Sequence, residues 1–110
     1  MALLLEPKAA TTIPLELEGI TPDRVRKLDI PQILGMEIFE GNNKAHLGDF
    51  FDVSGDPSDL HMRLQGDFSG VHWVGTKMSE GQITVEGSIG RHLGSEMTGG
   101  RIDVSGDASD

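Results

Sequence analysis

The sequence predicts an all-β protein, a right-handed parallel β-helix with coils of about 19–21 residues, preceded by a small α+β segment. Three observations predict this class: a string of residues that recurs along the chain, a high glycine content, and apolar residues that alternate with polar ones. Of the 15 glycines, only Gly19 comes before Gly35. A fixed period of this kind is typical of solenoid proteins.

The recurring string occurs twice in full and a third time in part: "MRLQGDFSGVHWVGTKMSEG" (62–81), "ITVEGSIGRHLGSEMTGG" (83–100) and "IDVSGDASD" (102–110). The alignment places Met62, Ile83 and Ile102 at one position, and Leu64, Val85 and Val104 at another. Coils this small cannot bury their side chains alone, so we expect them to stack at the spacing of paired strands, about 4.7–4.9 Å. The residues predicted to carry the repeat are Gly66, Gly75, Met78, Gly81, Gly87, Gly94, Met97, Gly99, Gly100 and Gly106.

Two regions follow from this alignment, an N-terminal segment of residues 1–46 and the first β-helix coils in residues 47–110. In the first region Leu15 and Leu17 alternate with glutamates, a half-buried strand pattern. Thr21 is the expected N-cap of a helix whose first position is Pro22. The expected elements are a strand at 11–18, helical turns at 22–28 and 30–34, and strands at 36–39 and 47–56.

Glycine spacing also argues against helical repeats, because each glycine inside a helix costs roughly 1 kcal/mol. The third copy of the string stops at Asp110, about nine residues before its next expected glycine pair. An unpaired strand edge invites pairing. We therefore expect the chain to be the N-terminal part of a longer β-helix, truncated at its C-terminus, or to have a partner covering that end.

The charge and composition exclude several functions. The formal net charge is −9, and no basic run is present, so binding to nucleic acid or to an anionic membrane is disfavoured. Without cysteine there is no disulfide and no thiolate site. The leucines near the N-terminus are too few for a signal peptide or a membrane span. We expect a cytoplasmic protein.

Histidines and aspartates are the first candidates for a metal site. A metal needs three or four converging ligands, and the alignment pairs no two histidines. The histidines are His46, His61, His72 and His92, and a second candidate group is Asp52, Asp56 and Asp59 with His61. The second group lacks the glycine and glutamate positions of an EF-hand loop. The favoured interpretation is histidines in turns and a solvated acidic turn, with no metal site.

Trp73 is a candidate contact with a partner, as tryptophans are at interface hot spots, or else it covers the edge of the core. Met78 and Met97 are interpreted as core residues rather than cofactor ligands. The sequence has no Gly-x-Ser-x-Gly elbow and no phosphate-binding loop. We therefore predict no catalytic, cofactor-binding or metal-binding residue in this chain.

At residues 90–110, "GRHLGSEMTGGRIDVSGDASD", the sequence resembles a glycine-repeat β-helix. That domain is shared by glutamate synthase large subunits and by the C subunit of formylmethanofuran dehydrogenase. Residues 17–56, "LEGITPDRVRKLDIPQILGMEIFEGNNKAHLGDFFDVSGD", are similar to the segment that precedes the repeats in this C-subunit family. "VHW" followed by "GRH" is more like the bacterial form, a formyltransferase/hydrolase complex. The resemblance covers about residues 14–110, and Gln32 departs from it where the family often has an acidic residue.

The resemblance implies a non-catalytic scaffold subunit of an enzyme complex in tetrahydromethanopterin-linked one-carbon metabolism. Its partners would be amidohydrolase-like and formyltransferase subunits. Molybdenum or tungsten pterin, iron–sulfur clusters or zinc would be held only by partner subunits. Two alternatives stay open: a stand-alone structural domain like that of glutamate synthase, and a β-helix with its own enzymatic or carbohydrate-binding activity.

Overall fold

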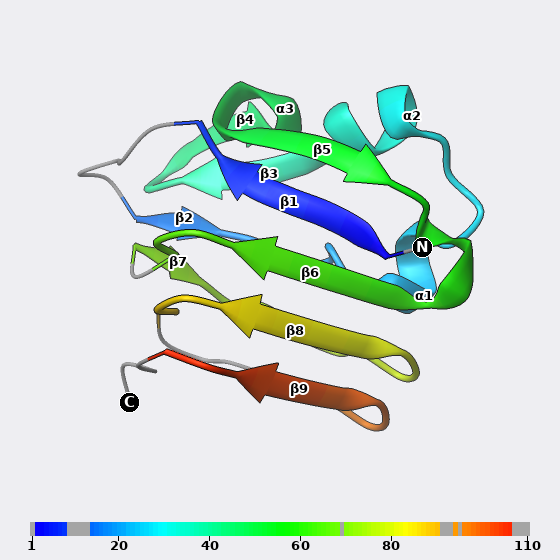
Figure 1. Cartoon of the computed structure of the whole chain (residues 1–110). Coiled ribbons are helices and arrows are strands. Elements are labelled where there is room, and N and C mark those ends of the chain that lie inside the picture. The colour runs from blue at the N-terminus through cyan, green and yellow to red at the C-terminus, as the bar shows by residue number, and fades with distance from the viewer. Residues whose placement is uncertain (1, 9–13, 69, 91–93, 95, 107–110) are drawn as a thin grey trace.

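The computed structural model describes residues 2–8, 14–68, 70–90, 94 and 96–106. Within these residues, two β-sheets face each other around an apolar interior; two of the short α-helices lie at one end of the molecule, and the third lies nearer its middle (Figure 1). Within the described residues, none of the helices is both long and apolar enough to cross a membrane.

The larger sheet, sheet A, combines antiparallel and parallel pairing. Its first two strands run antiparallel, and β1 pairs in parallel with the next strand, β6. The remaining pairs, β6 with β8 and β8 with β9, are also parallel. In spatial order the strands are β5 (Phe51–Gly55), β1 (Leu3–Pro7), β6 (His61–Gln65), β8 (Gln82–Glu86) and β9 (Arg101–Val104).

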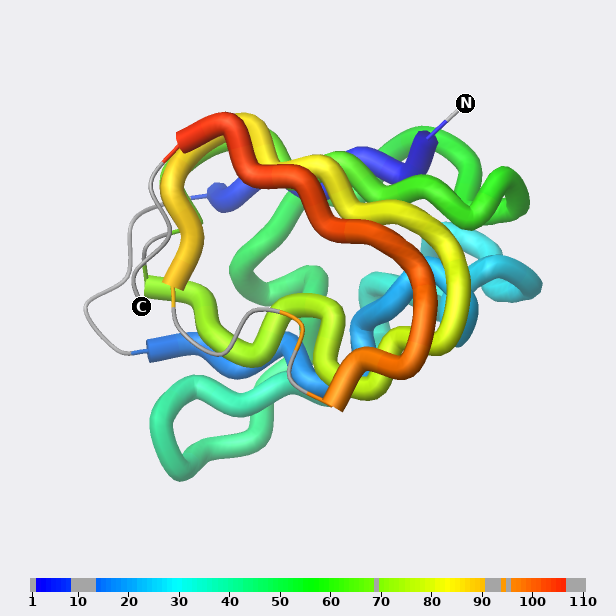
Figure 2. Tube along the Cα trace, turned by 90° about the horizontal axis from the view of Figure 1, so that it is seen from below, coloured from blue at the N-terminus to red at the C-terminus, as the bar shows by residue number. Residues whose placement is uncertain are grey.

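The register of the parallel strands is the one that the sequence alignment predicts. Met62 pairs with Ile83 and Ile83 with Ile102, while Leu64 and Val85 form the next position. The side chains at these positions on β6 and β8 are buried, and the residues between them face outward. Figure 2 shows the three strands lying one behind another along the direction of stacking.

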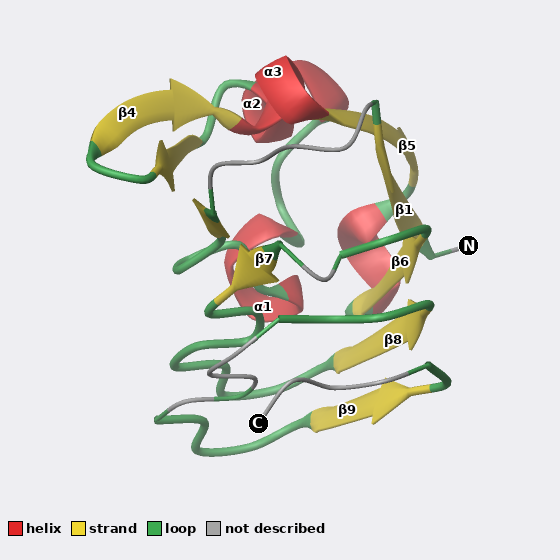
Figure 3. Cartoon of the chain, turned by 90° about the vertical axis from the view of Figure 1, so that its left-hand side faces the viewer, coloured by secondary structure: helices red, strands yellow, loops and turns green. Residues whose placement is uncertain are grey.

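The smaller sheet, sheet B, has the order β4 (Asn43–His46), β3 (Glu37–Glu40), β2 (Leu15–Glu16) and β7 (Val71–His72). β3 and β4 form an antiparallel hairpin, and Gly41 adopts φ +60 in its turn. β2 runs antiparallel to β3 and parallel to β7. The hairpin projects from the body of the molecule (Figures 2 and 3).

The first two helices begin where the sequence signals predict. The helix α1 (Pro22–Val25) and the helix α2 (Ile30–Leu34) both have proline in the first turn. Proline has no N–H, and it is favoured there because an N–H at the start of a helix has no partner within the helix. The other helical elements are α3 (Leu47–Phe50) and the 3₁₀ turn η1 (Pro57–Asp59). The expected strand at 47–56 is therefore wrong in its first half, because buried Leu47 and the Asp49 carboxylate, which accepts from the His46 N–H, favour a helical turn.

The predicted class, an all-β parallel β-helix, is wrong. The described part of the chain is a mixed α/β domain with two mixed sheets and three helices, and no parallel β-helix solenoid is evident in it. The physical reason is the N-terminal strand β1, which the sequence pattern did not indicate. Leu3 and Leu5 are fully buried, and they hold β1 between β5 and β6, so the sheet gains an antiparallel pair.

One core joins the two sheets. Within it the fully buried rings of Phe51 and Phe68 stack with centroids 5.5 Å apart. Phe51 begins β5, while Phe68 bridges to Ile89 in the following turn of chain. Residues 1–46 and residues 47–110 each contribute strands to both sheets.

Candidate functional site

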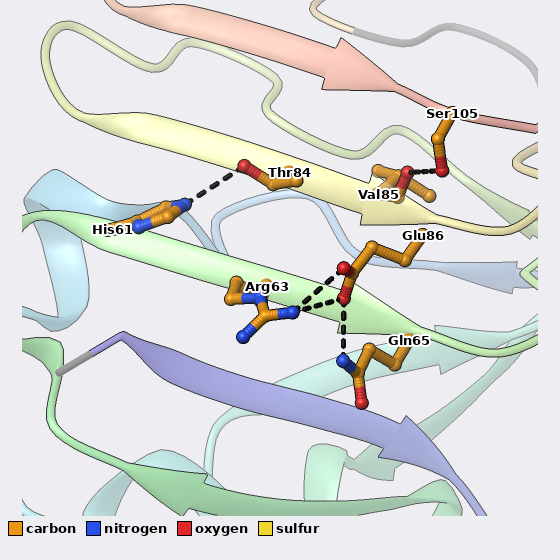
Figure 4. Close-up of polar contacts among 7 residues, drawn as sticks. All are labelled: His61, Arg63, Gln65, Thr84, Val85, Glu86 and Ser105. Carbon is orange, nitrogen blue, oxygen red and sulfur yellow. Dashed lines mark hydrogen bonds and ion pairs between the residues drawn. The ribbon is translucent and has the colours of Figure 1, made fainter.

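The outer face of sheet A carries a polar network that joins neighbouring strands (Figure 4). The Arg63 guanidinium donates to both carboxylate oxygens of Glu86, at 2.8 and 2.7 Å. Gln65 adds a third bond to the same carboxylate, from Nε2 at 2.6 Å. Farther along the strands, His61 Nε2 lies 2.9 Å from Thr84 Oγ1.

The hydrogen bonds lower the pKa of Glu86 below its usual value of 4.5. The bond from Gln65 is the largest cause, followed by that from Arg63, because both donors stabilise the charged carboxylate. The network continues to β9, where Asp103 accepts from Gln82 Nε2 and Arg101 Nε, each at 3.0 Å. On β6, β8 and β9 the polar groups of this face therefore largely satisfy one another.

The outer face of sheet B differs in chemistry. The strand register places Lys44, Phe39, Glu16 and His72 side by side in one row across the four strands. Phe39 is 41% exposed, and it is the exposed large hydrophobic residue of the described chain. A single exposed aromatic ring thus sits among charged neighbours on this sheet.

A further cluster of polar side chains joins α1 to the turn before β8. Asp23 Oδ2 accepts a hydrogen bond of 2.9 Å from Ser79 Oγ, and Arg26 lies 3.3 Å from Glu80. Thr21 is at the N-cap as predicted, but its side chain makes no capping bond. The buried oxygens Thr21 Oγ1 and Asp23 Oδ1 have no hydrogen-bond partner in the described structure.

The structure does not bring the candidate histidines together. His46 is exposed beside Asp49, while His61 lies in the sheet A network. The His72 ring lies against the backbone of Gly90. His92 lies outside the described residues. Among the described residues, no group of three or more histidines, aspartates or glutamates is arranged to hold a metal ion.

Two of the three candidate aspartates accept hydrogen bonds in local turns. Asp56 Oδ1 accepts from the Ser58 N–H at 2.9 Å, and this hydrogen bond is the main cause of the lowered pKa of Asp56. Asp59 Oδ1 accepts from the His61 N–H at 3.1 Å. Asp52 is exposed on β5, opposite Glu6 of β1.

The residues predicted to carry the repeat lie mainly where the chain turns between strands. Met78 is fully buried, and Met97 is partly buried against the core. A Cβ atom at Gly87 would collide with the Gly66 carbonyl oxygen, and the φ of +146 at Gly87 also disfavours other residues. Positive φ values occur at Gly66, Gly75, Gly81, Gly87, Gly94 and Gly100, whereas Gly99 and Gly106 have backbone atoms too close for a Cβ.

Trp73 is half-buried at the end of β7, with an unusual φ of +62. Its carbonyl oxygen accepts a 2.9 Å hydrogen bond from Thr76 Oγ1. Its role as a partner contact stays a prediction.

Sequence reasoning did not single out Phe39 or the sheet A network. For the network a signal was present, because the aligned strings put Gln65 and Glu86 at one outward position, with Arg63 two residues before Gln65. For Phe39 the signal was weak, since its exposure depends on a hairpin that the sequence pattern showed only in part.

No protein-family model matches the chain. The C subunit of the molybdenum-containing formylmethanofuran dehydrogenase 1 of Methanothermobacter thermautotrophicus is 41% identical over 95 residues, which cover 86% of this chain and 24% of the relative. The C subunit of the tungsten-containing formylmethanofuran dehydrogenase 2 of Methanothermobacter marburgensis is 38% identical over 96 residues, covering 84% and 36%.

A solved structure agrees with these relatives. A chain in the crystal structure of the formyltransferase/hydrolase complex (FhcABCD) from Methylorubrum extorquens, in complex with methylofuran, matches with a TM-score of 0.71 and 25% identity. The match covers 97% of this chain and 47% of that one.

These similarities define the class: the chain is related to subunits of multi-subunit enzyme complexes. Within that class, the predicted resemblance is confirmed, and the chain is a homologue of the C subunit of formylmethanofuran dehydrogenase. It spans about a quarter to a third of the length of these curated relatives.

Proposed function

We propose that the chain serves as a non-catalytic scaffold in a formylmethanofuran dehydrogenase or formyltransferase/hydrolase complex of tetrahydromethanopterin-linked one-carbon metabolism. The observation that carries the proposal is the 41% identity to the C subunit of such a dehydrogenase over 86% of the chain. The match to a chain of the FhcABCD complex supports the same role.

In this proposal the chain works by holding other subunits in place. Its partners are an amidohydrolase-like subunit and a formyltransferase subunit, and the complex is cytoplasmic. The partners, and not this chain, hold any molybdenum or tungsten pterin, iron–sulfur cluster or zinc. The polar groups described above serve the fold: carboxylates cap turns, and the outer face of sheet A is internally hydrogen-bonded.

Affinity purification of the tagged protein from its native host, followed by mass spectrometry, tests the proposal. We expect an amidohydrolase-like subunit and a formyltransferase subunit to co-purify in fixed proportion. Recovery of the protein alone, or with glutamate synthase components, would overturn the proposed function. Hydrolysis of formyl substrates by the purified chain alone would also contradict a non-catalytic role.

A further inference from the structure

The two sheets present outer faces of different character. On sheet A, the charged side chains of β6, β8 and β9 find partners on the same face: Arg63 with Glu86, and Arg101 with Asp103. These three strands offer few unpaired charges to a partner, and on β1 and β5 the exposed like charges of Glu6 and Asp52 face each other.

On the outer face of sheet B, an exposed aromatic ring lies between charged side chains of the neighbouring strands. Phe39 lies on β3 between Lys44 of β4 and Glu16 of β2, and its side chain is 41% exposed. Aromatic residues are enriched at protein interfaces, where polar and charged residues form the rim, and the strand register sets a charged residue on each side of this ring. The hairpin that carries it projects from the body of the molecule (Figure 3).

The charges around Phe39 are available to a partner. In the described part of the chain, Lys44 takes part in no ion pair, and neither do Glu16 and Glu37. Lys44 lies on one side of the ring and Glu16 on the other, while Glu37 lies two residues along β3. This rim therefore has a positive side and a negative side, and a matching surface must carry the opposite order of charges.

We propose that the outer face of sheet B, centred on Phe39, docks onto another protein of the complex. The partner surface has an apolar pocket for the Phe39 ring, a carboxylate opposite Lys44, and a lysine or arginine opposite Glu16 and Glu37. The inference rests on the proposed function, because it identifies where that scaffold meets its partner.

The test compares variants of the tagged protein, each purified from the native host and titrated against the isolated partner subunits. Phe39→Asp is expected to weaken binding by about tenfold or more, because hot-spot aromatics contribute at least that much. Ser54→Asp is the matched control, since it adds the same charge at an exposed strand position on the outer face of sheet A. It is expected to leave the affinity unchanged. Lys44→Glu is expected to weaken binding more at low salt than at high salt.

A photo-crosslinking residue at position 39 gives an independent readout that does not depend on the folding of Phe39→Asp. Crosslinks from position 39 to a partner support the proposal. If wild-type protein recovers its partners while Phe39→Asp binds them equally well and position 39 gives no crosslink, the docking surface is refuted and the scaffold role stands. If wild-type protein recovers no partner at all, the proposed function itself fails.

Discussion

At the scale of single residues, Glu86 links the polar network of sheet A to the stability of the fold. Its carboxylate accepts bonds from Gln65 and Arg63, which come from the neighbouring strand β6. Because these donors favour the charged form, the pKa of Glu86 is lower in the folded protein than in the unfolded chain. A group of this kind stabilises the fold above its unfolded pKa, and the contribution disappears as the pH falls through the folded pKa.

We therefore expect the melting temperature to decrease as the pH is lowered below about 4.5, with Glu86 as one contributor. Glu86→Gln removes the titrating group at this position, so the melting temperature should fall less steeply as the pH is lowered. Asp56, whose pKa is also lowered, still contributes to the decrease. Because the pair is partly exposed, the effect on stability at neutral pH should be small. Melting temperatures between about pH 3 and pH 7 measure this.

The carboxyl group itself provides the decisive measurement. An NMR titration of Glu86 should give a midpoint below 4.5, and Gln65→Ala should raise that midpoint. A midpoint at or above 4.5 in the wild-type protein would show that the hydrogen bonds from Gln65 and Arg63 do not persist in solution.

At the scale of elements, the two N-terminal helices differ in how they begin. Asp29 makes a full capping box with Gln32: the Asp29 carboxylate accepts from the Gln32 N–H at 2.9 Å, and the Gln32 side chain accepts from the Asp29 N–H at 3.0 Å. Thr21, before α1, makes no such bond, and its hydroxyl is buried. In both helices a capping residue comes one or two positions before a proline. The cap of α2 is hydrogen-bonded, whereas the Thr21 side chain makes no capping bond to α1.

Asp29→Ala should lower the free energy of unfolding by about 1 kcal/mol, because it leaves the Gln32 N–H in the first turn of α2 without its acceptor. Thr21→Val, which keeps the shape but removes the hydroxyl, should be neutral or slightly stabilising, because it removes a buried group that has no partner. Urea unfolding of both variants measures the difference. Equal destabilisation by the two variants would show that the Thr21 hydroxyl has a partner in solution.

The helices α1 and α2 and the parallel register were predictable from the sequence because their signals are local or repeated. Pro22 and Pro31 mark helix starts, and the aligned strings around Met62 and Ile83 indicate which strands pair. The hairpin β3–β4 was missed in its second strand, because "NKAH" has no apolar alternation and depends on the turn at Gly41 for its position.

At the scale of the whole molecule, the fold class could not be predicted from the repeat alone. Residues 3–7 form no alternating pattern, since Leu3, Leu4 and Leu5 are consecutive. Their partners lie about 50 to 60 residues away, at Val53 and Leu64. Pairing between residues this far apart gives no local sequence pattern. The sequence therefore did not predict β1, the strand whose antiparallel pairing with β5 makes the sheet mixed. Phe39 was missed for a related reason, because its exposure is decided by which strands surround it.

β1 should therefore control the stability of the whole domain, because it lies between β5 and β6 and belongs to two different pairings. Leu5 is fully buried, and Leu5→Ala should lower the free energy of unfolding by about 2–5 kcal/mol through lost burial and a cavity. The neighbouring Glu6 is exposed and faces Asp52 across the strand pair. Glu6→Ala should change the stability by less than about 0.5 kcal/mol, since it removes only a like-charge contact on the surface.

Urea unfolding followed by far-UV circular dichroism and by Trp73 fluorescence measures both variants. Trp73 directly follows β7 of sheet B, so a single transition seen by both signals would show that the loss at β1 is transmitted to the other sheet through the shared core. If Leu5→Ala unfolds with wild-type stability, or if Glu6→Ala is as destabilising as Leu5→Ala, β1 does not have the buried central position that the structure gives it.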